Sequence, residues 1–449
     1  MIRKFRPMRR RARYLARRMS RDPTSLSLRQ MNRLRVIEML YRQPGSSRTD
    51  LARWTGLSRA TVSTLVEELG DAGVVQEREG LNGEGPRPTG RPPVLLSLVP
   101  GAAFAVGLDF GHQHIRVAIC DLSGEVVAED WSPAEVDHAP SESLNLAHEL
   151  VGASLRGAGI ATDRLLGVGM GLAAPIYRAT GEIAADGILP GWHGIRPAAE
   201  MQARLGVAVE LENDANVGAL GEKVFGAARG IDDLVYVRVS AGIGAGLILG
   251  GRPYRGFRGV AGEIGHVLAD PTGAICRCGN RGCLETLASP VAVAALLERS
   301  TGTPVPVARV LELVAADDRG ARRAVADAGE AIGRALSMLV NVLNPELVVV
   351  GGDLAPAGAV LLDPMRAAIE RHGVAPAAGA VRVTAGTLGD RAEVLGAAGL
   401  ILSARPRGTR REVAERAHPA GSRAWRRPPS PRRTASSSSE AASAAFRPA

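Results

Sequence analysis

Between residues 28 and 70 the apolar positions recur every three or four residues, which is the spacing of one face of an α-helix. The pattern predicts a first helix that stops at Pro44 and a short second helix that stops at Gly56. A third helix is predicted from Ser58 to Leu69, and its apolar residues form one stripe: Val62, Leu65, Val66 and Leu69. A short helix, a glycine turn and a striped helix predict a helix-turn-helix unit.

Two short apolar runs, 74–75 and 94–98, flank a segment rich in Gly, Pro and Arg and predict a two-stranded wing. The helix face opposite the stripe carries small and polar residues, which would let the helix approach base edges closely. We therefore predict DNA contacts from this face and from the wing tip: Arg59, Ala60, Thr61, Ser63, Thr64, Arg87 and Arg91. The alternative is a small helical interaction module without a role in nucleic-acid binding.

From residue 104 the pattern changes to strands separated by tight glycine turns. Residues 104–129 predict a strand, a turn after Asp109, a second strand, a Ser-Gly hairpin and a third strand. The same order recurs over 234–254, which indicates an internal duplication. Such paired halves resemble the actin-like ATPase superfamily (ribonuclease H-like), which implies a two-lobed α/β domain with its ligand between the lobes. Helices are predicted over 321–343 and 391–403 to cover the sheets.

Composition and charge divide the chain of 449 residues into four parts. Its 45% hydrophobic and 22% charged residues are typical of a globular protein with two or three domains. Residues 1–27 carry ten basic side chains and one acid, and residues 404–449 carry eleven arginines and three glutamates. We predict a disordered basic arm, or leader sequence, over 1–27, a winged helix-turn-helix over 28–98, a two-lobed domain over 99–403, and a disordered Arg/Pro/Ser-rich tail over 404–449.

No apolar run reaches the roughly 18 residues of a membrane span, and no apolar segment follows the basic start as in a signal peptide. These features predict a cytoplasmic protein without a membrane partner. The segment 262–285 then holds three of the four cysteines, with a histidine ten residues before them. Three thiolates and an imidazole match a closed tetrahedral zinc site, structural rather than catalytic, with these ligands: His266, Cys276, Cys278 and Cys283. Cys120, alone on an apolar strand, is predicted to be ordinary core.

Three motifs carry a resemblance to a known family: Glu263-Ile-Gly-His266, the cysteine segment ending in Leu284-Glu285, and Glu212-Asn213-Asp214-Ala215-Asn216. With the glycine turns they make residues 104–403 resemble the ROK family, whose members are repressors, uncharacterised reading frames and sugar kinases. The added helix-turn-helix and TGRPP wing are similar to those of the family's regulators of xylose and N-acetylglucosamine use.

The resemblance implies a sugar site whose carboxylates, amide and imidazole bind hydroxyl groups: Asn213, Asp214, Glu263, His266 and Glu285. It also implies that His266 contacts sugar with one ring nitrogen and zinc with the other, and that the position of Asp214 is the general base in the family's kinases. A small sugar or sugar phosphate is then the expected effector, operator DNA the expected partner, and a homodimer or homotetramer the expected assembly.

The chain departs from the family's kinases where a nucleotide would bind. The kinases carry a Gly-Gly-Thr type turn after the first strand, whereas this chain has Gly111 followed by His112, Gln113 and His114. We therefore predict a sugar-responsive repressor without phosphorylating activity; the alternative is a sugar kinase with an added DNA-binding domain. A third hypothesis, a scaffold that has lost both ligand and catalysis, rests on Ile188 and the Ala173-Ala174 loop, where the resemblance implies other residues.

Overall fold

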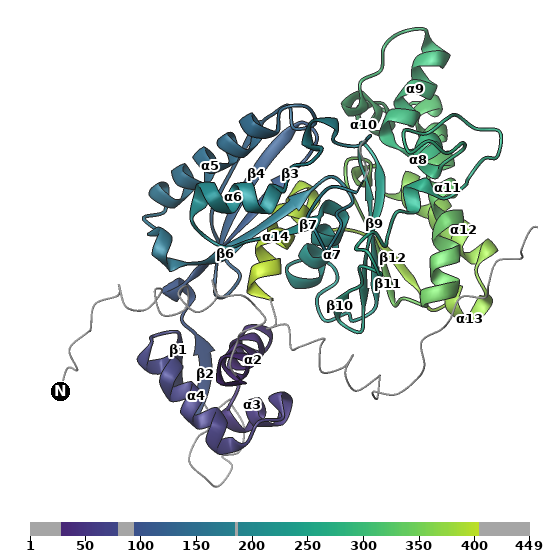
Figure 1. The fold of residues 1–449 in the computed structure, drawn as a ribbon. Coiled ribbons are helices and arrows are strands. Elements are labelled where there is room, and N and C mark those ends of the chain that lie inside the picture. The colour runs from purple at the N-terminus through teal and green to yellow at the C-terminus, as the bar shows by residue number, and fades with distance from the viewer. Residues whose placement is uncertain (1–27, 80–93, 185–186, 404–449) are drawn as a thin grey trace, which may run out of the picture. The chain divides into compact units, whose positions relative to one another are not determined.

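The computed structural model describes residues 28–79, 94–184 and 187–403 (Figure 1). The arm over 1–27, the tail over 404–449 and the wing-tip residues Arg87 and Arg91 lie outside the described residues, so the predictions made for them stay predictions. Every helix in the described part is too short or too polar to cross a lipid bilayer.

The amino-terminal unit is a winged helix-turn-helix, as the sequence predicts. Its elements are α2 (Leu28–Arg42), α3 (Arg48–Thr55), α4 (Arg59–Asp71), β1 (Val75–Glu79) and β2 (Val94–Leu98), and the two strands pair antiparallel. Ser47 forms a capping box with Asp50 at the start of α3, which ends at Gly56 in a left-handed conformation with φ 69°. All four residues of the predicted stripe on α4 are buried.

The first lobe is a mixed sheet in the order β5-β4-β3-β6-β7. Its strands are β3 (Phe104–Phe110), β4 (His114–Asp121), β5 (Val126–Pro133), β6 (Leu165–Leu172) and β7 (Val209–Asn213). The first three strands are antiparallel neighbours, and β6 and β7 continue the sheet in parallel with β3. Helix α5 (Pro140–Gly157) packs against β4, and α6 (Pro197–Leu205) packs against β7.

The second lobe repeats this plan in the order β10-β9-β8-β11-β12. Its strands are β8 (Leu234–Val239), β9 (Ile243–Leu249), β10 (Arg252–Pro253), β11 (Leu347–Gly351) and β12 (Arg382–Ala385). The helices between β10 and β12 are α8 (Leu284–Ala288), α9 (Pro290–Thr301), α10 (Val307–Ala315), α11 (Arg319–Leu343), α12 (Ala359–His372) and α13 (Ala375–Ala378). The matching strand orders confirm the internal duplication.

Two helices join the lobes: α7 (Asp214–Val224) follows β7, and α14 (Ala392–Leu402) follows β12. They pack on each other, α7 also packs on β8 and β9, and α14 also packs on β3 and β6 (Figure 1). A Cβ atom at Gly396 would lie 1.7 Å from the carbonyl oxygen of Val217, so only glycine permits this crossing. The starts of α7 and α14 therefore place Asp214 and Glu393 in the same region between the sheets.

Candidate functional site

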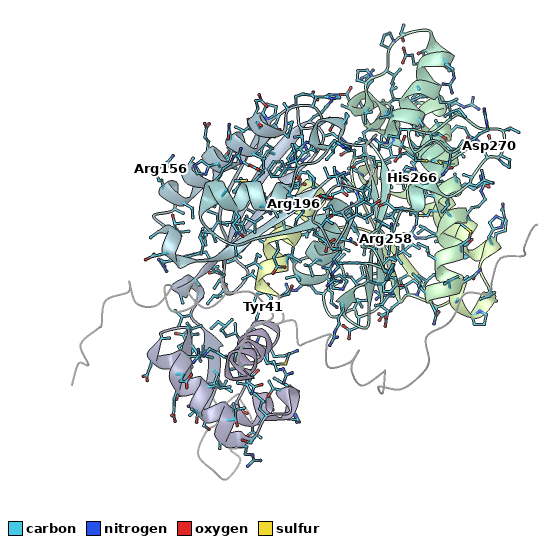
Figure 2. All side chains as sticks on the ribbon, viewed as in Figure 1. Tyr41, Arg156, Arg196, Arg258, His266 and Asp270 are labelled. Carbon is cyan, nitrogen blue, oxygen red and sulfur yellow. The ribbon has the colours of Figure 1, made fainter. Side chains whose placement is uncertain are left out.

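The four predicted metal ligands come together in the second lobe. His266, labelled in Figure 2, ends the short helix η5 (Ile264–His266). Cys276 and Cys278 lie in the following loop, and Cys283 precedes α8. Their ligand atoms all lie within 4.8 Å of one another, and the Sγ atoms of Cys278 and Cys283 are 3.6 Å apart. Thiolates on one tetrahedral zinc ion, with Zn–S bonds of about 2.3 Å, have comparable separations. The cluster therefore could hold a metal ion.

His266 connects this cluster to a carboxylate. Its Nδ1 atom faces Cys276 Sγ at 3.6 Å, and its Nε2 atom lies 3.9 Å from Glu263 Oε2. Burial and the nearby carboxylates of Asp214 and Glu285 together raise the pKa of Glu263 to about 7, against the opposing charge of Arg277. Near neutral pH a group of this kind can either donate a hydrogen bond to a ligand or accept one.

Glu285, at the start of α8, is held by two partners. Its Oε2 atom accepts a hydrogen bond from the backbone N–H of Ile243 at 3.2 Å, and its Oε1 atom accepts one from Arg277 Nε at 3.0 Å. Sequence reasoning missed Arg277, which lies between two cysteine ligands. The spacing of the cysteines could have indicated it, because a residue between two metal ligands must direct its side chain away from the ion and toward neighbouring groups.

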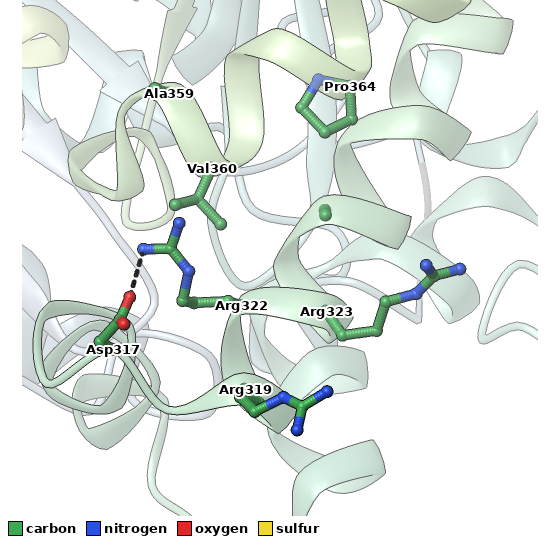
Figure 3. A pocket seen from close by; sticks show the side chains of 8 residues that line it. Asp317, Arg319, Arg322, Arg323, Ala359, Val360 and Pro364 are labelled. Atoms are coloured by element: carbon green, nitrogen blue, oxygen red, sulfur yellow. Dashed lines mark ion pairs between the residues drawn. The ribbon is translucent and has the colours of Figure 1, made fainter.

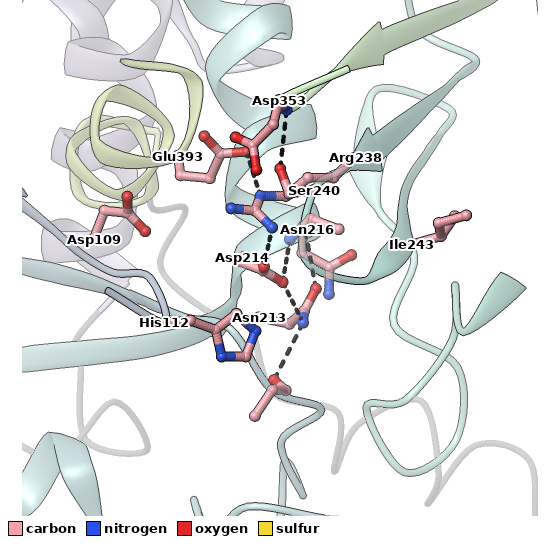
Figure 4. Close-up of polar contacts among 12 residues, drawn as sticks. Asp109, His112, Asn213, Asp214, Asn216, Arg238, Ser240, Ile243, Asp353 and Glu393 are labelled. Carbon is pink, nitrogen blue, oxygen red and sulfur yellow. Dashed lines mark hydrogen bonds and ion pairs between the residues drawn. The ribbon is translucent and has the colours of Figure 1, made fainter. Parts of the chain in front are cut away.

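Asn213 caps the start of α7, and Asp214 is the first residue of that helix. The polar atoms of both side chains form hydrogen bonds with neighbouring protein groups (Figure 4). The Asn213 side chain accepts from Asn216 N, and its Nδ2 atom donates to Ala174 O at 3.1 Å and to Asp214 Oδ1 at 2.8 Å. Asp214 Oδ1 also accepts from Ala215 N, while Asp214 Oδ2 lies 3.2 Å from Arg238 Nη1. Both carboxylate oxygens of Asp214 are thus engaged.

Arg238 and Glu393 are the other residues that sequence reasoning missed here. Arg238 Nε donates to Glu393 Oε1 at 3.1 Å, and the hydroxyl of the buried Tyr236 donates to the same oxygen at 3.0 Å. Arg238 lies on a strand and Glu393 in the first turn of a helix. Charged residues at such positions are usually exposed to solvent. Nothing in the local pattern distinguishes them, because their pairing joins residues 155 positions apart.

The turn between β3 and β4 is occupied by its own histidines. His114 Nε2 lies 3.0 Å from Asp109 Oδ2, and His112 Nδ1 lies 2.8 Å from Asp137 Oδ1. The His114 ring packs so closely on the turn that a Cβ atom at Gly111 would lie 2.3 Å from it. The imidazoles therefore bind neighbouring carboxylates rather than leaving the turn's backbone open to a phosphate.

The predicted base-contacting face of α4 is accessible. Arg59, Ala60 and Thr64 are exposed, and Ser63 is half-buried. Thr61 is also half-buried, and its hydroxyl lies 2.8 Å from that of the cap residue Ser58. Short polar side chains on this face thus remain available to another molecule, while the opposite face packs in the core of the unit.

A pocket away from the predicted sugar residues lies where α11 begins, next to α12 (Figure 3). Its lining is Asp317, Arg319, Arg322, Arg323, Ala326, Ala359, Val360 and Pro364. Arg322 pairs with Asp317 at 3.0 Å, and Arg323 pairs with Asp327. The pocket shares no residue with the predicted sugar site, and it carries no functional argument.

Comparison with known proteins identifies the two parts of the chain. Residues 105–404 match the ROK family. The chain belongs to the ROK family. In this ROK protein, residues 32–76 also match a winged helix-turn-helix DNA-binding family, in agreement with the fold of α2 to β1.

Three relatives of this ROK protein show what the family contains. The chain is 30% identical to the xylose repressor of Caldicellulosiruptor bescii, over 84% of this chain and 96% of the repressor. It is also 30% identical to the glucokinase of Thermotoga maritima, over 66% of this chain and 96% of the kinase. The solved structure of a ROK family transcriptional regulator, a homologue of the Escherichia coli MLC protein, superposes with a TM-score of 0.71 and 25% identity, over 84% of this chain and 96% of that chain.

Proposed function

We propose that this chain is a sugar-responsive, DNA-binding transcriptional repressor of carbohydrate-utilisation genes. The observation that carries the proposal is the winged helix-turn-helix joined to a ROK domain, an arrangement whose match to a xylose repressor extends over 84% of the chain. Asn213, Asp214, Glu263, His266 and Glu285 would bind the effector, and zinc held by His266 and the three cysteines would order that site. A sugar that favours one angle between the lobes would change operator affinity.

The test is selection of an operator from random DNA, repeated with D-xylose, D-glucose and N-acetylglucosamine. We expect a pseudo-palindromic operator bound by a homodimer or homotetramer, with lower affinity when one of these sugars or its phosphate is present. Light scattering of the complex reports the assembly. Failure to select any DNA sequence, with the folded protein confirmed by circular dichroism, would contradict the proposal.

Recognition is assigned to Arg59, Ala60, Thr61, Ser63 and Thr64 on α4, with Arg87 and Arg91 of the wing supplying affinity. Thr64→Ala should cost about 1–3 kcal/mol on the operator and little on random DNA. Thr301→Ala, an exposed threonine at the end of α9, is the matched control and should have no effect. Equal loss on both kinds of DNA would show that Thr64 does not read bases.

A sugar kinase is the second candidate, favoured by the relation to a glucokinase. The contacts of Asp214 oppose it, because both carboxylate oxygens already accept hydrogen bonds or pair with Arg238. A coupled ADP-release assay across hexoses should show no turnover. Turnover that disappears in Asp214→Ala would establish the kinase and overturn this part of the proposal.

A further inference from the structure

The guanidinium of Arg238 meets the carboxylates of Asp214 and Glu393 where the lobes join, and Asp109 lies on the same side of the site (Figure 4). Asp214 begins α7, Glu393 lies in the first turn of α14, and Arg238 reaches both from β8. The third carboxylate, Asp109 near the end of β3, raises the pKa of both Arg238 and Glu393 through its negative charge. Four elements from both halves of the duplicated domain therefore contribute to one ionic cluster.

The cluster is shielded from water, so its charges need partners inside the protein. The side chains of Arg238 and Asp214 are 12% and 13% exposed, and that of Glu393 is 6% exposed. Burial alone would lower the pKa of Arg238, but the carboxylates of Asp214, Glu393 and Asp109 raise it well above its usual range. An uncompensated buried charge is strongly destabilising, so carboxylates gathered in this way require a cation.

Asp109 adds a further buried carboxylate oxygen to this region. Its side chain is 2% exposed, and its Oδ1 atom has no hydrogen-bond partner among the described residues, although Oδ2 contacts His114. Buried oxygen atoms from several carboxylates are the ligands that Mg²⁺ and Mn²⁺ prefer. Phosphoryl transfer from a nucleotide also requires a divalent cation to neutralise the phosphate charge.

We propose that Arg238 is a built-in cation that takes the place of a divalent metal among Asp109, Asp214 and Glu393. The guanidinium pairs with Asp214 and Glu393 without a metal, and its positive charge opposes the binding of a magnesium nucleotide between the lobes. The inference rests on the proposed function, because it explains how this domain can sense a sugar without phosphorylating it. It also assigns Arg238 as a positioning residue for Asp214, since their ion pair fixes Asp214 Oδ2.

The experiment measures binding of Mn²⁺ alone to the zinc-loaded full chain by electron paramagnetic resonance. We expect no tight Mn²⁺ site in the wild type, about one per chain in Arg238→Gln, and none in Arg238→Lys, which restores the positive charge. Mn²⁺ should raise the melting temperature of Arg238→Gln only, and adding Asp109→Asn should abolish this gain. Arg255→Gln is the matched control, because it removes a partly buried guanidinium that pairs with a single carboxylate, Glu212.

Absence of a new Mn²⁺ site in folded, operator-binding Arg238→Gln would overturn the inference, as would a wild-type site of equal affinity. Should Arg238→Gln be too unstable to purify, the double variant Arg238→Gln/Glu393→Gln replaces it. This variant keeps the carboxylates of Asp109 and Asp214, and absence of a new Mn²⁺ site in it would likewise overturn the inference. Failure of the proposed function is recognised separately. It would appear as absent operator binding or as ATP-dependent sugar phosphorylation by the wild type, neither of which is measured by Mn²⁺ titration.

Discussion

The two lobes have the same strand order, but the turns at corresponding places differ in chemistry. In the first lobe, the turn between β3 and β4 is closed by His114, which contacts Asp109. In the second, the strand after the turn begins with Ile243, whose N–H donates to Glu285 of the predicted sugar site. Duplication has thus preserved the backbone plan, while the side chains at the two turns differ.

The difference extends to the charges around each turn. Near the first turn, His112 contacts Asp137 and His114 contacts Asp109 Oδ2, although Asp109 Oδ1 has no hydrogen-bond partner among the described residues. Near the second turn, Glu263 has a pKa of about 7 and its Oε2 atom lies 3.9 Å from a ring nitrogen of His266. The Glu263 side chain is 34% exposed and accessible to a ligand, whereas breaking a buried pair such as Asp109–His114 is costly.

The largest expected effect comes from disrupting the metal cluster of the second lobe. Cys278→Ser should reduce zinc from about one ion per chain to none and abolish the release of operator by sugar, because the loop would no longer position His266 and Glu285. Elemental analysis and gel-shift titration measure the two effects. Cys120→Ala, which changes the buried cysteine of β4, should keep its zinc. No metal in wild-type protein purified without chelator would disprove the assignment.

A smaller loss of sugar response should follow when a predicted sugar-binding residue is changed and the four predicted metal ligands are kept. Glu285→Gln should weaken sugar binding about 10- to 100-fold, since hydrogen bonds to charged groups contribute about 1.5–3 kcal/mol. Calorimetry with D-xylose, D-glucose and N-acetylglucosamine measures the affinity. Glu298→Gln, on an exposed face of α9, should bind like the wild type. Unchanged affinity in Glu285→Gln would remove this residue from the site.

The first turn should respond in stability rather than in sugar affinity. His114→Ala leaves the buried carboxylate of Asp109 without its imidazole partner and should lower the free energy of unfolding by about 1–3 kcal/mol. His112→Ala should cost less, because the side chain of its partner Asp137 is 27% exposed and can be rehydrated. Urea denaturation measures both variants. A larger cost for His112→Ala would reverse the order of importance assigned to the two histidines.

A further effect should be a pH-dependent decline in stability that originates between the lobes. Burial raises the pKa of Glu393 from 4.5 to about 7 despite the opposing charge of Arg238. The folded state then holds a proton that the unfolded state releases, so this group's contribution to stability falls as pH rises from about 4.5 to about 7. The melting temperature of Glu393→Gln, measured from about pH 4.5 to about pH 7, should not show this decline. Glu346→Gln, whose carboxylate pairs with Arg382 on the surface, is the control and should retain it.

Local sequence determined the helix-turn-helix, the repeated succession of strand, turn, strand and hairpin, and the gathering of three cysteines with one histidine. Each is encoded within a short segment: Ser47 and Gly56 bound α3, the stripe on α4 defines its buried face, and close spacing brings Cys276, Cys278 and Cys283 together. The sequence also predicted the helices over 321–343 and 391–403 within two residues, because their apolar residues follow the helical period.

Only the tertiary structure decided which charged side chains neutralise one another. Arg277 was missed because its partner Glu285 comes from α8, and Arg238 because its partners begin two different helices. The close crossing of α7 and α14, permitted by Gly396, brings Asp214 and Glu393 to the same guanidinium. Periodicity reports which face of an element is buried, but ionic pairing depends on distance and burial in three dimensions, and those are set only when the elements pack.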